Sequence, residues 1–355
     1  MNFNAFEPGH LIYTFYLILL LFFTLVNYNR TNRQNLIVFV IFIIAQILIG
    51  GLRSYQVGTD TGSYVYYFEQ VKWQSIPEIL MTTLYKEPFF FIVAKFMMLI
   101  NDTYPFVLFS FQLIFWICVA IILYRYSSNC LLALLFVISM RFNFFVMSGL
   151  RQAVAMGIVF FSFHFLLNGK AYKFVATVML ASFFHASALL FLITLQFTKI
   201  KIRSTIYVIL LSVGFLIIAF LLPDIHFEED MAYSNYLNKT SEDLGNLFSF
   251  LITTLAFLFI HLLIKKNLTE KTNLLYNLSL FAFLLSLMGV RLTVAYRISM
   301  YFGLFMPILM TNLMYKSSNK SIFVFAMTIA VLVVYIITGV PVGLAHTFFW
   351  QINPF

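Results

Sequence analysis

The chain is short of charged residues and of cysteine. Asp, Glu, Lys and Arg make up only 10% of its 355 residues, and Asp and Glu together number 13. A soluble protein of this length needs more polar surface than this, so the composition excludes the soluble globular class. Two cysteines, Cys118 and Cys130, provide neither a disulfide framework nor metal-ligand spacing. The net charge of +9 comes from basic residues in short stretches between apolar runs, so we expect no nucleic-acid partner.

Apolar runs dominate what is present. Hydrophobic residues make up 62% of the chain, and phenylalanine alone occurs 45 times. Residues 11–26, 36–51, 106–123 and 321–340 each have about the length of a membrane-crossing helix. The sequence therefore predicts an all-α polytopic protein of the lipid bilayer, forming a single domain over residues 1–355, with roughly ten to twelve crossings.

Charged residues between these runs predict the orientation. Basic residues cluster at 30–33, 199–203, 265–271 and 316–320. Cytoplasmic loops are rich in Lys and Arg, so the acidic loops at about 52–86 and 223–245 are expected on the outer face. Residues 61–85 are polar and aromatic, which is typical of short amphipathic helices at the membrane interface.

Two apolar segments do not fit as full crossings. Residues 87–100 are few and include Lys95, whereas residues 173–197 have basic residues on both sides. Full crossings would place Lys170 and Lys173 outside, against the charge rule. Re-entrant or broken helices remove the conflict, and such breaks at membrane depth line cavities.

Ionisable side chains at the edges of apolar runs are costly, so each is a functional candidate. Arg53 and Asp60 lie in a glycine-containing loop, where Arg53 either binds a phosphate or carboxylate or pairs with Asp60 to pin the loop. Glu87 precedes Pro88 and either acts in a site or caps a helix.

Further candidates lie later in the chain. Arg151 and Gln152 follow a Ser-Gly break, and a guanidinium there is expected to face a cavity. His185 lies at the suspected helix break and is either functional or a hydrogen-bonded core residue. Arg291 and Arg297 follow, and Arg297 shares a helix face with Tyr301. Three other histidines lack this context, and we expect them to have structural roles: His164, His261 and His346.

Several arginines near an aspartate and a glutamate favour an anionic ligand, such as a phosphate or pyrophosphate head group in the membrane. No Walker loop, dinucleotide fingerprint, H-E-x-x-H motif or Cys/His cluster is present in the sequence. We therefore expect neither nucleotide-driven transport nor zinc chemistry, and neither a metal nor a cofactor.

Five motifs in order resemble the EpsG-like branch of the Wzy-type bacterial polysaccharide polymerases. They are RSYQVGTDTGSY at 53–64, EPFF at 87–90, SGLRQAVAMGI at 148–158, LASFFHASALL at 180–190 and YRISMYF at 296–302. The resemblance implies a C-type membrane glycosyltransferase that polymerises repeat units of O-antigen, capsule or exopolysaccharide. Its substrates would be undecaprenyl-pyrophosphate-linked oligosaccharides, and its site would face the periplasm or exterior from the bacterial plasma (inner) membrane. Its further partners would be a chain-length regulator and a flippase of the same pathway.

The resemblance also implies residue roles. Arg53, Arg151 and Arg297 would hold pyrophosphate, and one of Asp60, Glu87 or His185 would be the general base that activates the acceptor hydroxyl. Asp60 is the first choice, because its glycine-flanked loop can approach a sugar, and His185 is the second. Stacking faces for sugars, or else an interfacial aromatic belt, would come from Tyr64, Tyr66, Tyr67, Phe68 and Trp73.

Three other functions remain open from the sequence. An O-antigen ligase or a membrane acyltransferase also uses arginine or histidine at the outer face, although a ligase is expected to have a larger outer loop than 223–245. A non-enzymatic flippase for the same lipid-linked sugar needs charges accessible from both faces. Here the charges gather toward one face.

Overall fold

The computed structural model describes residues 8–82, 85–202, 204–221, 244–264, 269–338 and 347–351. These residues are almost entirely helical, and an isolated antiparallel bridge joins Arg53 and Phe348. The predicted all-α class is therefore confirmed. His346 and most of the predicted outer loop at 223–245 lie outside the described residues.

The chain divides into two compact units, Met1–Leu189 with Thr328–Phe355 and Leu190–Met327. The first contains α1 (Pro8–Val26), α2 (Asn32–Gly51), α3 (Thr61–Trp73), α4 (Ile76–Met81), α5 (Pro88–Met98), α6 (Tyr104–Tyr126), α7 (Cys130–Ser139), α8 (Phe142–Ser148), α9 (Leu150–Leu167) and α10 (Ala171–Phe184). The second contains α11 (Thr194–Phe197), α12 (Thr205–Leu221), α14 (Leu244–Leu263), α15 (Glu270–Gly289), α16 (Thr293–Gly303) and α17 (Met306–Lys316). The 3₁₀ helix η1 (Ala186–Ile193) and α18 (Lys320–Thr338) contain the boundaries. The expectation of one membrane domain stays a prediction.

Helix length and composition identify a polytopic membrane protein. Among the described residues, α2, α6, α9 and α15 are long and apolar enough to cross a bilayer. The pairs α7–α8 and α16–α17 pass the same test but are bent by 58° and 44°. Broken helices are therefore present, as expected, and α10 also ends before η1 at the predicted break. Further apolar helices are present besides these, so the number of crossings stays a prediction.

In the first unit, α6 packs between α2 and α9, and α9 also packs on α10. Glycine permits the close approach at two of these contacts. A Cβ on Gly51 would lie 2.7 Å from Phe109 Cα, and one on Gly157 would lie 3.1 Å from Phe115 Cα. These glycines bring α2 and α9 close to α6, and Leu150 and Gln152 at the start of α9 are buried.

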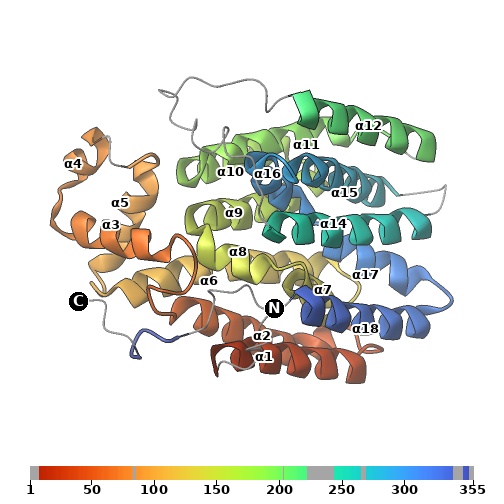
Figure 1. Cartoon of the computed structure of the whole chain (residues 1–355), viewed down its shortest axis with the longest axis horizontal. Helices are drawn as coiled ribbons and strands as arrows, with labels where there is room; N and C mark the ends of the chain where they lie inside the picture. The colour runs from red at the N-terminus through yellow and green to blue at the C-terminus, as the bar shows by residue number, and fades with distance from the viewer. Residues whose placement is uncertain are drawn as a thin grey trace. The chain divides into compact units, whose positions relative to one another are not determined.

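Helices α3, α4 and α5 form a compact group beside one end of α6, drawn in orange in Figure 1. Tyr64 and Phe68 of α3 pack on Phe90 of α5 with ring centroids 5.7 and 6.2 Å apart. Phe90 in turn stacks on Phe111 of α6 at 4.3 Å. This aromatic core holds the start of α5 against α6. The short helices predicted over 61–85 are thus present as α3 and α4, and their place at the membrane interface stays a prediction.

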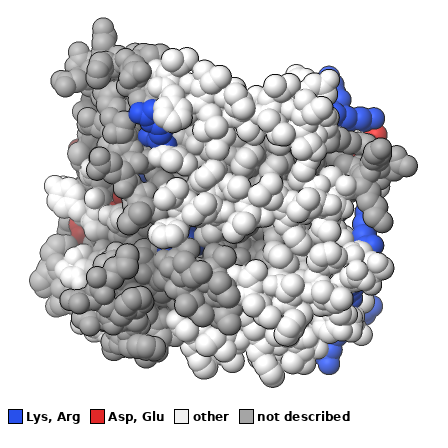
Figure 2. Space-filling model, turned by 45° about the vertical axis from the view of Figure 1, so that its right-hand side comes forward, with Lys and Arg blue, Asp and Glu red and all other residues white. Residues whose placement is uncertain are grey.

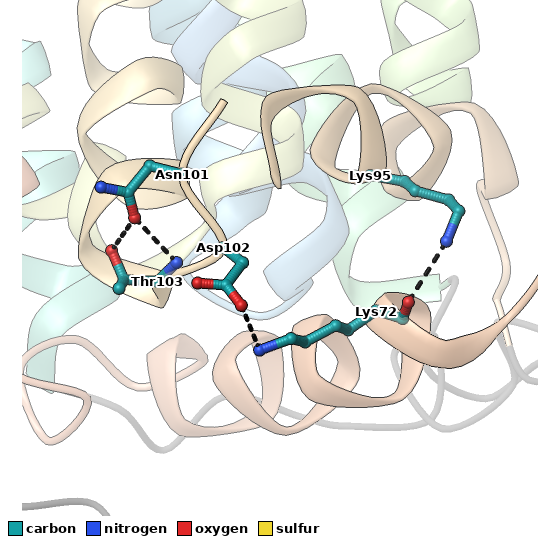
Figure 3. A network of polar contacts seen from close by, with 5 residues as sticks. All are labelled: Lys72, Lys95, Asn101, Asp102 and Thr103. Carbon is teal, nitrogen blue, oxygen red and sulfur yellow. Dashed lines mark hydrogen bonds and ion pairs between the residues drawn. The ribbon is translucent and has the colours of Figure 1, made fainter. Parts of the chain in front are cut away.

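A polar network ties the far ends of these helices together (Figure 3). Lys95 extends from the apolar α5 to the C-terminal carbonyls of α3, and its Nζ lies 3.2 Å from Val71 O and 3.3 Å from Lys72 O. A cation is stabilised there by the helix dipole. The Lys72 side chain makes an ion pair of 2.5 Å with Asp102, just before α6. Lys95, which makes a full crossing by residues 87–100 unfavourable, therefore joins α5 to α3.

In the second unit, α15 is the central helix and packs on α12, α14 and α16. Phe257 of α14 stacks on Phe283 of α15 at 4.8 Å. A Cβ on Gly289 would lie 2.8 Å from Tyr296 Cα, so only glycine allows α16 to approach the end of α15 so closely. His261 Nδ1 lies 2.7 Å from Tyr276 Oη, which agrees with the structural role expected for this histidine.

The surface is largely apolar. Figure 2 shows a broad, mostly white face with one blue group at its upper left, and most of the other visible Lys and Arg side chains lie at the right-hand edge. Large apolar side chains such as Ile37, Ile206 and Ile322 are exposed on their helices. A surface of this kind is suited to lipid rather than water, which agrees with the membrane class.

Candidate active site

Glu87 lies where the chain enters α5, immediately before Pro88. Its residue is only 6% exposed, and its side chain makes no capping hydrogen bond to α5. The sequence left open whether this glutamate caps its own helix, and the structure directs the carboxylate elsewhere. A buried carboxylate is costly unless it is paired and hydrogen-bonded, so its partners define the site.

Three partners surround the Glu87 carboxylate. Arg151 Nη1 lies 2.6 Å from Oε2, and His185 Nδ1 lies 2.5 Å from Oε1. The main-chain N–H of Ala186 also donates to Oε1, at 3.4 Å. The structure therefore brings together three of the residues singled out from the sequence, two of them 98 positions apart.

Each member of the group lies at a helix end. Arg151 is in the first turn of α9, directly after the break at Gly149. His185 follows α10 in an extended conformation, with φ −158° and ψ 118°, and Ala186 begins η1. Helix starts present unpaired N–H groups and a partial positive charge, which together favour a carboxylate at this position. The helix breaks thus create the polar site within an apolar bundle.

The electrostatics favour an ionised Glu87. Burial raises the pKa of this carboxyl, but the His185 hydrogen bond and the charges of His185 and Arg151 outweigh it and lower the pKa below the usual range. The side chains of Arg151 and His185 keep 25% and 17% of their surface exposed, against 7% for Glu87. The carboxylate is therefore the most buried member of the group, and Arg151 and His185 are its more accessible partners.

A carboxylate on Nδ1 determines what the histidine can do. An ionised carboxylate only accepts hydrogen bonds, so Nδ1 carries the proton and the imidazole Nε2 is the nitrogen left to exchange protons. Carboxylate–histidine pairs of this kind orient the general base of many hydrolases. The pair makes His185 a chemically competent general base, with Glu87 as the residue that orients it.

Two other predicted residues border Arg151. Its guanidinium carbon lies 5.9 Å from the centre of the Tyr64 ring, and Gln152 is the next residue in α9. Tyr64 and Gln152 are only 5% and 4% exposed. Tyr64 is therefore part of the aromatic core next to the site. Of the other aromatic residues proposed to stack on sugars, Phe68 is buried, whereas Tyr66 and Trp73 are exposed.

The loop before α3 holds Arg53 and Asp60 in different surroundings. Asp60 is partly exposed, immediately precedes α3 and makes no side-chain capping bond. Arg53 is fully buried and donates to oxygens of the chain itself. No ion pair joins the two side chains, both of which the structure describes. Arg53 does pin the loop, but through main-chain carbonyls rather than through Asp60.

The remaining predicted anion-binding residues belong to the second unit. The Arg291 guanidinium lies 4.8 Å from the centre of the Phe220 ring, just after the end of α15. Arg297 and Tyr301 lie one turn apart on α16, where Arg297 is half-buried and Tyr301 is 2% exposed. The shared helix face inferred from their spacing is present. Whether they act on the same ligand as Arg151 stays a prediction.

Thr61 escaped notice in the sequence. It is fully buried at the first position of α3, and its hydroxyl contacts the main-chain carbonyl of Met147, 86 residues away. A threonine followed by polar residues carries no signal of such a contact, because the partner is a main-chain oxygen. Among the described residues, no group of three or more His, Cys, Asp or Glu side chains could hold a metal ion.

Fold and site together define a polytopic helical membrane protein with a buried carboxylate, a histidine and an arginine gathered at helix ends. A family model agrees with this class. It matches residues 36–350, and the chain belongs to the EpsG family, a family of polysaccharide polymerase-like membrane proteins. No curated protein and no solved structure shows a significant match to the chain.

Proposed function

We propose that this protein polymerises polysaccharide by transferring a growing glycan from undecaprenyl pyrophosphate to a new lipid-linked repeat unit. Membership of the EpsG family supports a polymerase-like role. The observation that carries the proposal is the contact of Glu87 with both His185 and Arg151, at 2.5 and 2.6 Å. It combines an oriented base with an arginine suited to phosphate oxygens, which are the two groups that this reaction needs.

The reaction uses these groups in one displacement. His185 Nε2 accepts the proton of the acceptor hydroxyl, and the acceptor oxygen forms a bond to the anomeric carbon of the donor glycan. The bond between that carbon and the pyrophosphate oxygen breaks, and its electron pair leaves with undecaprenyl pyrophosphate. Glu87 holds the imidazole and stabilises its positive charge, and Arg151 stabilises the charge that develops on the pyrophosphate.

We change the order of preference among the three candidate bases. Asp60 comes first from the sequence, because its glycine-flanked loop can approach a sugar, but a contact with an orienting carboxylate supports His185. We therefore assign the base to His185 and its orientation to Glu87. Asp60 remains a candidate for contacting a sugar, because it is partly exposed at the start of α3.

The other predicted residues take binding roles in this proposal. Gln152 and Tyr64 border Arg151 and would position its guanidinium. Arg291, Arg297 and Tyr301, which belong to the second unit, stay candidates for binding an anion. Positively charged cytoplasmic loops support a site on the periplasmic or outer face of the bacterial plasma membrane. A chain-length regulator and a flippase of the same pathway would be partners.

Two alternatives keep some support. An O-antigen ligase or a membrane acyltransferase would also use a carboxylate-oriented histidine, so the geometry at Glu87 is compatible with both. A flippase has no need of a general base, so this geometry is less suited to it. The family match favours the polymerase over all three.

The test is polymer growth by the purified full-length protein in lipid nanodiscs. The substrate is the lipid-linked glycan fraction that accumulates in cells lacking the gene. We expect the wild type to lengthen these glycans and release undecaprenyl pyrophosphate. Arg151→Ala should slow growth by about 10²–10³-fold, and Arg151→Lys should restore only part of the rate because lysine cannot bind phosphate bidentately. Transfer to lipid A or of an acyl group, without chain growth, would favour an alternative.

A further inference from the structure

The break between α8 and α9 frees main-chain carbonyls just before Arg151. α8 ends at Ser148, and α9 starts its own hydrogen bonding with Ala153 N donating to Gly149 O at 2.8 Å. The last carbonyls of a helix lack partners within it and need other donors when buried. Met147 O is one of these carbonyls, four residues before Arg151.

Arg53 and Thr61 supply the donors for this carbonyl. Arg53 Nη2 donates to Met147 O at 3.0 Å, and the Thr61 hydroxyl lies 3.1 Å from the same oxygen. Thr61 Oγ1 also lies 2.7 Å from Val57 O, so its single proton is shared between two carbonyls. Both residues are fully buried. Two side chains before and at the start of α3 thus bind one main-chain oxygen at the end of α8, Met147 O.

Further hydrogen bonds hold the Arg53 guanidinium in place beside Met147 O. Arg53 Nε donates to Val57 O at 3.1 Å, and Arg53 Nη1 donates to Gly50 O at the end of α2. Arg53 also donates to Thr61 Oγ1 at 3.4 Å. The guanidinium is therefore engaged at all three of its nitrogens by the protein. Burial lowers the pKa of Arg53 to about 10, which still leaves the group charged near neutral pH.

The loop also touches the break at a second place. Gly58 has φ +96°, and a Cβ there would lie 2.5 Å from Met147 O. Thr59 N lies 3.4 Å from the hydroxyl of Ser148. The loop therefore lies directly on the α8–α9 break, and only glycine permits that approach at position 58.

We infer that Arg53 and Thr61 are positioning residues that fix the start of α9, and with it Arg151, by holding the Met147 carbonyl. This inference rests on the proposed role of Arg151. It replaces the expectation that Arg53 binds pyrophosphate, because its nitrogens are engaged by carbonyl and hydroxyl oxygens inside the protein. Small displacements of a group that contacts the reacting atoms reduce the rate strongly.

A matched pair of Thr61 variants tests the inference. Thr61→Val keeps the shape of the side chain but removes the hydroxyl, whereas Thr61→Ser keeps the hydroxyl. In the nanodisc assay we expect Thr61→Val to lower kcat by about 10- to 100-fold with little change in KM. Thr61→Ser should stay close to the wild type. A general loss of stability would also lower the apparent kcat with KM unchanged, because less of the protein is folded, so the rates are expressed per folded protein.

Hydrogen exchange provides a readout that does not depend on activity. The amides of residues 151–153 should exchange faster in Thr61→Val than in the wild type or Thr61→Ser, because the start of α9 loses its restraint. Combining Thr61→Val with Arg151→Lys should reduce kcat by less than the product of the two single losses, since both changes affect the same guanidinium.

The outcomes separate this inference from the proposed function. If the wild type does not lengthen lipid-linked glycans, the proposed function fails, and hydrogen exchange alone decides whether the loop restrains α9. If Arg151→Ala is inactive but Thr61→Val has wild-type kcat and exchange, the positioning role is wrong. Multiplicative losses in the double variant, or a raised KM for Thr61→Val alone, would also overturn it and return the loop to ligand binding.

Discussion

Single residues carry the chemistry of this protein, and Glu87 is the most informative of them. Its value as a candidate followed from the sequence, because a carboxylate beside a long apolar run is costly. The same cost makes Arg151 and His185 candidates. Their mutual contacts did not follow from the sequence, since no local spacing relates residue 87 to residue 151 or 185. The orientation of Arg53 was equally hidden, because its partners are main-chain oxygens.

The ion pairs of Glu87 predict a pH-dependent stability. Because the folded pKa of Glu87 is lowered, its ionised form stabilises the fold above the unfolded carboxyl pKa of about 4.3. This stabilisation is lost as the pH falls from there through the lower folded pKa. Thermal unfolding in nanodiscs from pH 7 to pH 3 should show wild type more stable than Glu87→Gln at pH 7. The difference should shrink in the acidic part of the range.

Two outcomes would contradict this prediction about stability. A Glu87→Gln variant as stable as the wild type at pH 7 would show that the ion pairs contribute nothing net, as happens for some buried pairs. A difference that persists unchanged to pH 3 would show that the pKa of Glu87 is the same in the folded and unfolded protein.

At the scale of elements, broken helices shape the site. The breaks at Gly149 and His185 were expected from a Ser-Gly pair and from the basic flanks of 173–197. The bend of 58° between α7 and α8 was not expected. It occurs at Arg141, a non-glycine residue with φ +66°, and the surrounding sequence contains neither glycine nor proline. Tertiary contacts rather than local propensity impose that bend, so no sequence pattern predicts it.

The contact of the loop with the α8–α9 break gives a prediction at the same scale. Gly58→Ala should destabilise the protein by about 1–3 kcal/mol, because alanine is strained at a positive φ and its Cβ would meet Met147 O. Gly62→Ala is the matched control, four residues on in α3. A Cβ there would lie 3.7 Å from its nearest neighbour, Tyr55 O, and alanine favours helix.

Thermal unfolding of the two variants in nanodiscs measures this difference. We expect Gly58→Ala to unfold at a lower temperature and to exchange amide protons at residues 151–153 faster than Gly62→Ala. Equal behaviour of the two variants would contradict the close contact between the loop and Met147.

For the whole molecule, composition was enough to predict the class. With 10% charged residues and many apolar runs, a helical membrane protein was the consistent outcome, and the family match over residues 36–350 agrees. The division into two compact units was not visible, because no shift in composition or linker marks residues 189 and 327. Hydrophobic helices look alike in sequence whether they contact lipid, one unit or the other.

The central claim is that a histidine oriented by Glu87 drives glycosyl transfer, and its most direct test is the rate of polymer growth by His185→Gln. In nanodiscs with lipid-linked glycans, the variant should grow polymer about 10²–10⁴-fold more slowly than the wild type, because the general base is lost. Glu87→Gln should also be slow, and the double variant should be little slower than His185→Gln. A His185→Gln protein that folds and grows polymer at the wild-type rate would contradict the account.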